Sequence, residues 1–423
     1  MARRAVIVGG IRTPFVKAFK EFLRHDTIDL GVAAAGALID KFDLPRAEID
    51  AIRWGGVILP SGAPNVGREI ALDLKLPPTV EAMTLTRACA TGLQAITTAA
   101  AEIERGDYDV AIAGGSDSTS NAELKLPQKV VRTLGPVMMG GKSTPADLLG
   151  AVAKLAPFTD IFPRIPKIAE RTTGEVMGEA AEKMARRNEI SREAQDAFAA
   201  RSHHRAAAAI QSGRFDREIT PVGDVYADTI VRADTSAEKL GKLRPVFAKD
   251  GTLTAGNSSA LTDGAAAVLI MSEDKAKALG YTPLAAFRSW SYVGVDPADQ
   301  LLMGPAIAIP KALDRAGITL ADADYVDLHE AFAAQVLSVL KMMASDAFAK
   351  ARLGRDKAVG EVDDSKLNVH GGSVALGHPF GATGARMVTT MANELALTGK
   401  QLAVLGICAA GGLGAAAVLE RIG

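Results

Sequence analysis

Two cysteines and a few histidines are the side chains of this sequence best suited to nucleophilic and acid–base chemistry. Cys89 lies in the segment TRACATGLQA, at the expected start of a helix. The unpaired N–H groups and the partial positive charge of a helix N-terminus favour a thiolate, and the small neighbouring residues leave room for an acyl chain. A lone cysteine is, however, more often a small buried hydrophobe. Position alone leaves both interpretations open.

His378 and Cys408 lie in two glycine-rich segments nearer the C-terminus. His378 belongs to GGSVALGHPFGATGAR, where glycines permit tight turns and Pro379 disfavours helical geometry at the histidine. Such a histidine can act as a base near a cysteine or can simply cap a helix. Cys408 ends an apolar strand in LAVLGICAAGGLG. The following turn can present its thiol together with backbone N–H groups, although packing is the commoner role of such a cysteine.

His329 follows a predicted strand in the segment DLHEAFAAQ. A zinc-binding helix of the HExxH type needs a second histidine at position 333, which is alanine, so we expect no metal. Of the remaining histidines, His370 is ambiguous and three are expected to be solvated surface residues, namely His25, His203 and His204.

An internal repeat connects the cysteine and histidine segments. Residues 90–114 align with residues 382–406 without a gap, and nine of the 25 positions are identical. A fainter match, in the same order, pairs residues 38–50 with residues 312–324. Chance alignment of alanine-rich helices is the alternative explanation. Two copies of one α/β unit explain the shared order better, and their equivalent loops would meet in one site on a pseudo-twofold axis.

The elements that must position this site read as alternating buried strands and helices. We predict a strand at 5–10, a helix at 30–42, and a helix at 88–104 that leads into a strand at 109–114. Apolar runs bounded by glycine and alternating with helical segments indicate an α/β architecture with buried sheets.

Length and composition describe a globular protein of two to three domains. The chain has 423 residues, of which 48% are hydrophobic and 23% charged, and its formal net charge is −1. This balance argues against a nucleic-acid partner. Two cysteines favour a reducing compartment, and the N-terminus lacks the features of a signal peptide. No run reaches the roughly 18 apolar residues of a membrane span, so we expect a cytoplasmic protein.

Residues 121–171 differ from the rest of the chain. They contain six prolines, and eight Lys or Arg against four Asp or Glu. This composition does not predict a self-sufficient core. One interpretation is a loop domain folded over the active site, and the other is a docking surface for a partner subunit or an anionic membrane face. We expect 121–250 to be an insertion in an N-terminal half formed by 1–120 and 251–275, with a C-terminal half at 276–423.

Taken together, the motifs resemble those of thiolases over almost the full length of the chain. The matching blocks, in family order, are GIRTPF, CATGLQA, AGNSSALTDGAAA, HEAFA, GGSVALGHPFGATG and CAAGGLG. The resemblance implies the thiolase fold, in which two βαβαβαββ halves form a five-layer αβαβα sandwich with an inserted loop domain. It also implies thiolysis of 3-ketoacyl-CoA by coenzyme A through an acyl-cysteine. Acyl-CoA and coenzyme A would be substrates, without a further cofactor, and the chain would be a homodimer or a dimer of dimers.

The resemblance assigns roles to individual residues. Cys89 matches the acylated nucleophile, His378 the base that activates it, and Cys408 the acid/base that exchanges a proton with the acetyl-CoA methyl carbon. One oxyanion hole would fall on His329 with His378, and the other on the backbone N–H groups of Cys89 and Ala410. In the coenzyme A site, Arg232 would contact the adenosine end and Ser259 would lie near the pantetheine. Met177 would form a wall of the pocket.

Two positions depart from the usual thiolase pattern. His329 replaces an asparagine and Ala410 replaces a glycine. Both departures resemble the β-subunit of trifunctional fatty-acid oxidation complexes, which implies degradation of longer 3-ketoacyl-CoA and a possible hydratase/dehydrogenase α-subunit as partner. A biosynthetic acetoacetyl-CoA thiolase, a decarboxylating ketoacyl synthase and a non-catalytic acyl-CoA-binding subunit are the alternatives. Cys408 argues against the synthase, because loss of CO₂ generates the carbanion without a second cysteine.

Overall fold

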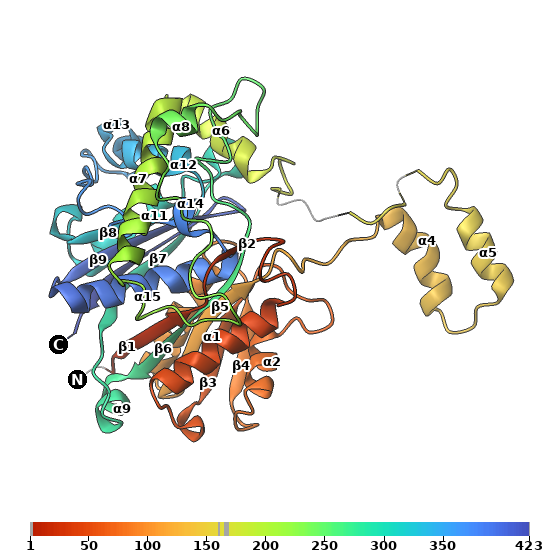
Figure 1. Ribbon diagram of the computed structural model, residues 1–423, viewed down its shortest axis with the longest axis horizontal. Coiled ribbons are helices and arrows are strands. Elements are labelled where there is room, and N and C mark those ends of the chain that lie inside the picture. The colour runs from red at the N-terminus through yellow and green to blue at the C-terminus, as the bar shows by residue number, and fades with distance from the viewer. Residues whose placement is uncertain (1–2, 160, 165–168, 423) are drawn as a thin grey trace. The chain divides into compact units, whose positions relative to one another are not determined.

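The computed structural model describes residues 3–159, 161–164 and 169–422. The chain divides into two compact units, one made of residues 1–121 and 169–423 and the other of residues 122–168. The larger unit contains the sheet and all the residues discussed above as candidates for chemistry (Figure 1).

The N-terminal half of the sheet has a mixed order. Strand β5 pairs in parallel with β3, which also pairs in parallel with β4, while β6 runs antiparallel to both β5 and β1. A two-residue strand, β2, pairs with β6. The strands are β1 (Ala5–Arg12), β2 (Val16–Lys17), β3 (Ala51–Gly55), β4 (Glu81–Leu85), β5 (Val110–Asp117) and β6 (Thr262–Ser272). The helices of this half are α1 (Thr27–Lys41), α2 (Val66–Asp73), α3 (Thr91–Arg105) and α9 (Glu273–Ala278).

The C-terminal half repeats this arrangement in mirror order. Strand β9 pairs in parallel with β8, and β10 runs antiparallel to both β9 and β7. Because β7 also pairs with β1, the path β3-β5-β6-β1 continues as β7-β10-β9-β8. The strands are β7 (Ala285–Gly294), β8 (Tyr325–Leu328), β9 (Leu402–Ala409) and β10 (Leu413–Arg421). The principal helices are α11 (Pro305–Ala316), α12 (Ala333–Met343) and α15 (Phe380–Thr398), with short helices α10 (Pro297–Gln300), α13 (Asp346–Phe348) and α14 (Ser373–Leu376).

Alternate residues of the strands face different cores, which produces five layers. In β9, Leu405 and Ile407 point into a central core shared with α3 and α15, whereas Val404 and Cys408 point into an outer core shared with α11 and α12. The N-terminal strands divide in the same way between the central core and a second outer core under α1 and α2. Figure 1 shows α15 running between the two sets of strands. The five-layer thiolase architecture expected from the sequence is therefore present.

Two glycines let the central helices α3 and α15 touch. A Cβ atom on Gly92 would lie 2.4 Å from the carbonyl oxygen of Gly381, and one on Gly384 would lie 2.3 Å from the backbone nitrogen of Leu93. No larger residue fits such a backbone-to-backbone approach. Gly92 and Gly384 are equivalent positions of the sequence repeat. The repeat therefore keeps glycine at the contact between the two central helices.

Further helices connect the first half to its return strand β6. They are α6 (Met177–Arg187), α7 (Arg192–Gln211) and α8 (Ala237–Gly241), and all three belong to the larger unit. The smaller unit contains α4 (Gln128–Met139) and α5 (Pro145–Ala153). Its buried apolar side chains are few among the described residues, namely Val130, Ala151 and Leu155.

The elements predicted from sequence are found, with shifted ends. The strand at 5–10 is β1, the helix at 30–42 begins earlier, at Thr27, and the strand at 109–114 is β5. Asp26 explains the early start, since its side chain caps the helix by accepting hydrogen bonds from the N–H groups of Ile28 and Asp29. The helix at 88–104 begins later, at Thr91, because the preceding residues form a turn. None of the helices in the described part of the chain combines the length and apolar character that a membrane crossing requires.

Candidate active site

Cys89 lies in a strained turn just before helix α3. Ala88 has φ of 45°, in the left-handed region that residues other than glycine rarely adopt. The hydroxyl of Thr91 stabilises this turn: its oxygen accepts a hydrogen bond of 2.6 Å from the N–H of Arg87, and it donates one of 2.5 Å to the carbonyl oxygen of Ala88. The turn leaves the thiol half-buried at the start of the helix.

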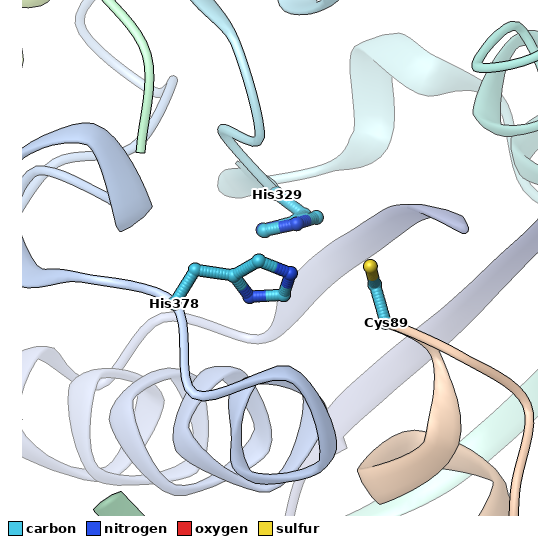
Figure 2. Close-up of side chains that lie close together, drawn as sticks. All are labelled: Cys89, His329 and His378. Atoms are coloured by element: carbon cyan, nitrogen blue, oxygen red, sulfur yellow. The ribbon is translucent and has the colours of Figure 1, made fainter. Parts of the chain in front are cut away.

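Cys89 faces His329 and His378, which come from the other half of the fold. The cysteine sulfur and one ring nitrogen of each histidine all lie within 4.8 Å of one another. Figure 2 shows the thiol pointing toward the two imidazoles. The ring centroids of the histidines are 4.2 Å apart, and both side chains are buried. The structure thus brings together three of the residues singled out in the sequence.

Two hydroxyl groups orient the imidazoles. Nδ1 of His378 is 2.6 Å from the hydroxyl oxygen of Thr383, and Nδ1 of His329 is 3.0 Å from that of Ser373. With Nδ1 engaged, each Nε2 is buried and has no hydrogen-bond partner among the described residues. Buried polar atoms are normally paired, so two such atoms side by side mark a place where a ligand binds.

Burial keeps the resting site uncharged. It raises the pKa of Cys89 to about 12, although the backbone N–H groups of Ala410 and Cys89 itself lower this pKa. Burial also lowers the pKa of His378 to about 3 and that of His329 well below its usual value, and in both cases the charge of Arg386 contributes in the same direction. The helix N-terminus favours a thiolate at Cys89, whereas burial acts in the opposite direction and raises the pKa of the thiol.

Cys408 and Ala410 lie at the end of β9 and in the turn that follows it. Cys408 is fully buried, and its pKa is raised by burial and further by the neighbouring Cys89. The N–H of Ala410 is close enough to the Cys89 sulfur to affect its pKa, as is the N–H of Cys89. Both N–H groups are therefore placed beside the atom at which an attacked carbonyl group would be bonded.

Glu330 holds helix α14, whose first residue, Ser373, is the partner of His329. Its buried carboxylate accepts hydrogen bonds from the hydroxyl of Ser202, the amide of Asn368 and the backbone N–H of Val374, at 2.7 Å, 2.7 Å and 3.1 Å. Burial raises the pKa of Glu330, whereas these three donors lower it. The carboxylate thereby joins α7 to α14, which begins at Ser373.

A cavity of about 470 Å³ contains two of the predicted coenzyme A contacts. Arg232 and Ser259 both line it, and Met177 is not among its lining residues. Met177 packs instead against the outer core of the C-terminal half. His203 also lines the cavity, where its Nδ1 accepts a hydrogen bond of 3.2 Å from the N–H of Arg232. The expectation of a solvated His203 is wrong, since the side chain is buried.

Sequence reasoning missed the two hydroxyls that orient the histidines. Thr383 is an identical position of the repeat, and its counterpart Thr91 supports the Cys89 turn, so the repeat was a usable signal for it. Ser373 had no such signal, because nothing in GGSVALGH distinguishes its hydroxyl from a solvated one.

Comparison with known proteins agrees with this site. Residues 5–274 match the thiolase N-terminal domain and residues 281–421 the thiolase C-terminal domain. The chain is 46% identical over 424 residues to the 3-ketoacyl-CoA thiolases of Yersinia pestis (strain Pestoides F) and Yersinia pseudotuberculosis (serotype IB, strain PB1/+), covering 99% of this chain and 97% of each relative.

Solved structures of similar proteins cover the whole chain. The Bacillus anthracis acetyl-CoA acetyltransferase is 33% identical with a TM-score of 0.85, and the match covers 100% of this chain and 99% of that one. Human mitochondrial 3-ketoacyl-CoA thiolase in complex with CoA is 31% identical with a TM-score of 0.83, at the same coverage. From its two domain matches, its full-length relatives and the architecture described above, this chain belongs to the thiolase family.

Proposed function

We propose that this thiolase cleaves 3-ketoacyl-CoA with coenzyme A, yielding acetyl-CoA and a shortened acyl-CoA in fatty-acid β-oxidation. The observation that carries the proposal is the convergence of Cys89 with His329 and His378 from opposite halves of the fold, within 4.8 Å. The full-length identity of 46% to 3-ketoacyl-CoA thiolases supports the same reaction.

The reaction begins when His378 Nε2 takes the proton of Cys89 as the sulfur attacks the 3-keto carbon. A raised thiol pKa and a lowered imidazole pKa favour a neutral resting pair, so the proton moves during attack rather than before it. The N–H groups of Cys89 and Ala410 adjoin the sulfur and would stabilise the oxyanion formed on that carbon. Removing one such donor typically costs about 10²–10³ in rate.

Cleavage of the carbon–carbon bond expels the enolate of acetyl-CoA and leaves an acyl group on Cys89. The Nε2–H groups of His329 and His378 would stabilise the enolate oxygen. His329 carries this proton when Ser373 donates to its Nδ1, whereas His378 receives it from Cys89 while its own Nδ1–H donates to Thr383. The thiol of Cys408 would protonate the enolate carbon. Its raised pKa supports this role, since a thiol that stays protonated can act as the acid. Coenzyme A then gives its thiol proton to the Cys408 thiolate and takes the acyl group from Cys89, whose sulfur recovers its proton from His378.

Coenzyme A would occupy the cavity lined by Arg232 and Ser259. The guanidinium of Arg232 suits the phosphates at the adenosine end, and Ser259 suits the pantetheine amides. We retain Met177 as a pocket wall of the coenzyme A site, although it is not among the residues that line this cavity.

Steady-state kinetics test the reaction. Initial rates measured against both substrates for 3-ketoacyl-CoA of increasing chain length should give the parallel lines of a ping-pong mechanism, and Cys89→Ala should remove turnover. A preference for long chains supports the β-oxidation role. Activity confined to acetoacetyl-CoA would indicate the biosynthetic thiolase instead, and release of CO₂ from malonyl-CoA would indicate a ketoacyl synthase.

Assembly and location extend the proposal. We propose a cytoplasmic enzyme that forms a dimer or dimer of dimers. His329 in place of asparagine and Ala410 in place of glycine support its resemblance to the β-subunit of a trifunctional complex and, with it, a hydratase/dehydrogenase α-subunit as partner. We also propose the division into 1–120 with 251–275, an inserted domain at 121–250, and 276–423. The end of the thiolase N-terminal domain match at 274 supports the last boundary.

The smaller unit is where this proposal places partner docking. Leu148, Leu149 and Phe158 are exposed by 45%, 72% and 54% of their surface. Replacing the three with polar residues should abolish co-purification of the α-subunit while thiolysis of a short substrate continues. Unchanged co-purification would exclude this surface as the docking site, and loss of folded protein would identify the unit as a structural part of the enzyme.

A further inference from the structure

The sulfur and nitrogen atoms of the active site have the composition of a metal site. Cys89 Sγ and a ring nitrogen of each of His329 and His378 lie within 4.8 Å of one another, and both Nε2 atoms are buried without a hydrogen-bond partner among the described residues. Thiolate and imidazole are the ligands that Zn²⁺ prefers in proteins. The cluster is invisible to sequence spacing, because its members come from three separate segments.

The hydroxyl partners allow both imidazoles to act as ligands. A hydroxyl can donate or accept a hydrogen bond, so Ser373 and Thr383 can each accept Nδ1–H and leave the Nε2 lone pair free for a metal. Metal-bound histidines normally donate their second N–H in this way, which fixes the ring. The hydroxyl groups of Ser373 and Thr383 can therefore support either state of Nε2: protonated and donating to an oxyanion, or unprotonated and bound to a metal ion.

We propose that Cys89, His329 and His378 form a site for one Zn²⁺ ion, which inhibits the enzyme reversibly by occupying its nucleophile. Zn²⁺ bonds to the sulfur, the thiol proton leaves to solvent, and no atom changes oxidation state. Ligand atoms about 2.0–2.3 Å from a tetrahedral zinc are roughly 3.3–3.6 Å from one another, so a contraction of about 1 Å closes the site. The fourth position stays open to water or to the thiol of coenzyme A.

Nearby charges act in opposite directions on a bound cation. Asp117 is a buried carboxylate whose charge acts on Cys89, and it favours a cation there. The positive charge of Arg386 acts on both histidines and disfavours a cation there. The proposed site depends on His329, because the asparagine usual at this position in thiolases offers only an amide, which is a poor zinc ligand. The inference rests on the geometry of these three residues and not on the proposed reaction.

Binding of the metal alone tests the site without any turnover. Full-length protein, reduced and treated with a chelator that is then removed, is titrated with Zn²⁺ by calorimetry and with Co²⁺ by absorption spectroscopy. We expect one ion per chain, a thiolate-to-cobalt charge-transfer band, and visible bands typical of tetrahedral cobalt. Zn²⁺ should abolish thiolysis, and a chelator should restore it.

Variants identify the ligands. Cys89→Ala and His329→Asn should weaken Zn²⁺ binding by at least about 100-fold, the upper range for loss of a residue that merely orients a ligand. Cys408→Ala and His370→Asn are matched controls that leave these ligands in place and should retain the affinity. Unchanged affinity in His329→Asn, or the same loss in Cys408→Ala, would overturn the assignment.

Acylation provides a second test in the unmodified enzyme, should a variant fail to fold. An acyl-CoA that leaves its acyl group on Cys89 should remove the cobalt charge-transfer band, since a thioester sulfur is a poor ligand. Persistence of the band in the acyl-enzyme would contradict the proposal. So would the absence of Zn²⁺ binding at micromolar concentrations in the free enzyme, whether or not that enzyme proves to be active.

Discussion

Thr91 and Thr383 occupy equivalent positions in the two halves of the fold, and each holds a residue of the candidate site in place. The Thr91 hydroxyl bridges the backbone of the turn before Cys89, and the Thr383 hydroxyl bonds Nδ1 of His378. Both threonines lie at the start of a central helix, α3 or α15. The two halves thus have similar helix starts, and the site combines the thiol of one with the imidazole of the other.

Removal of the Thr383 hydroxyl tests this relationship. In Thr383→Val the side chain keeps its shape, but the ring of His378 loses the partner that fixes its orientation, so we expect kcat to fall about 10- to 100-fold. KM should change little, because Thr383 is not among the residues that line the coenzyme A cavity. Thr383→Ser is the matched control and should restore most of the activity. Equal kcat in the valine and serine variants would show that the hydroxyl has no role in catalysis.

Ser373 should act on His329 in a corresponding way. Ser373→Ala removes the hydroxyl that sets the ring, and with it the control over whether Nε2 carries a proton. We expect kcat for carbon–carbon cleavage to fall about 10-fold or more, below the 10²–10³ typical of a lost oxyanion donor. Alkylation of Cys89 should be unaffected, since that step needs no enolate stabilisation. A parallel loss in both measurements would instead indicate a general disturbance of the site.

The fold and the principal site residues could be predicted because their signals are local. Glycines at helix contacts, the CATG and GHPFGATG motifs and the strand periodicity each reflect a short-range requirement. The burial of His203 could not be predicted, because it is decided by segments distant in sequence. The helix start and the small neighbours favour a thiolate at Cys89, whereas burial raises the pKa of its thiol. The cluster of Cys89, His329 and His378 has no signature in sequence spacing, because its members come from three separate segments.

Alkylation kinetics check the order and ionisation of the two thiols. Cys89 is half-buried and Cys408 fully buried, so stoichiometric iodoacetamide should modify Cys89 first and remove activity in step. Because the pKa of Cys89 is raised to about 12, the alkylation rate should still be rising at pH 9, by about tenfold per pH unit. Prior incubation with 3-ketoacyl-CoA should protect the thiol. A rate that levels off near neutral pH would show that the thiolate is present at rest.

Isotope exchange separates the roles of the two cysteines. Cys408→Ala should stop exchange of the acetyl-CoA methyl protons with solvent deuterium, since the buried thiol is the proposed proton carrier. Cys89 should still form an acyl-enzyme from a simple acyl-CoA, detectable by mass spectrometry of the intact protein. In Cys89→Ala, by contrast, no acyl-enzyme should be detected. Normal exchange in Cys408→Ala would move the acid/base role to another group, for which His378 is the obvious candidate.

The pH dependence of stability should report the burial of His203. Burial lowers its pKa from 6.5 to about 4, with Arg232 and His204 adding to the effect. Between these values the unfolded chain binds one proton more at this site than the folded chain, so the free energy of unfolding falls as pH falls below about 6.5. Each such proton changes stability by about 1.4 kcal/mol per pH unit, or about 2 kcal/mol between pH 6.5 and 5.

Comparing the pH dependence of unfolding in a His203 variant and in the unmodified protein isolates the contribution of this histidine. Asp117 and Asp327, whose pKa values burial raises to about 6, take up protons in the folded state and oppose the histidine as pH falls. His203→Gln keeps an acceptor for the N–H of Arg232 but cannot be protonated. Urea unfolding at pH 7 and pH 5 should therefore show a stability loss about 2 kcal/mol smaller in the variant than in the unmodified protein. Identical losses would mean that His203 is protonated in the folded chain at pH 5.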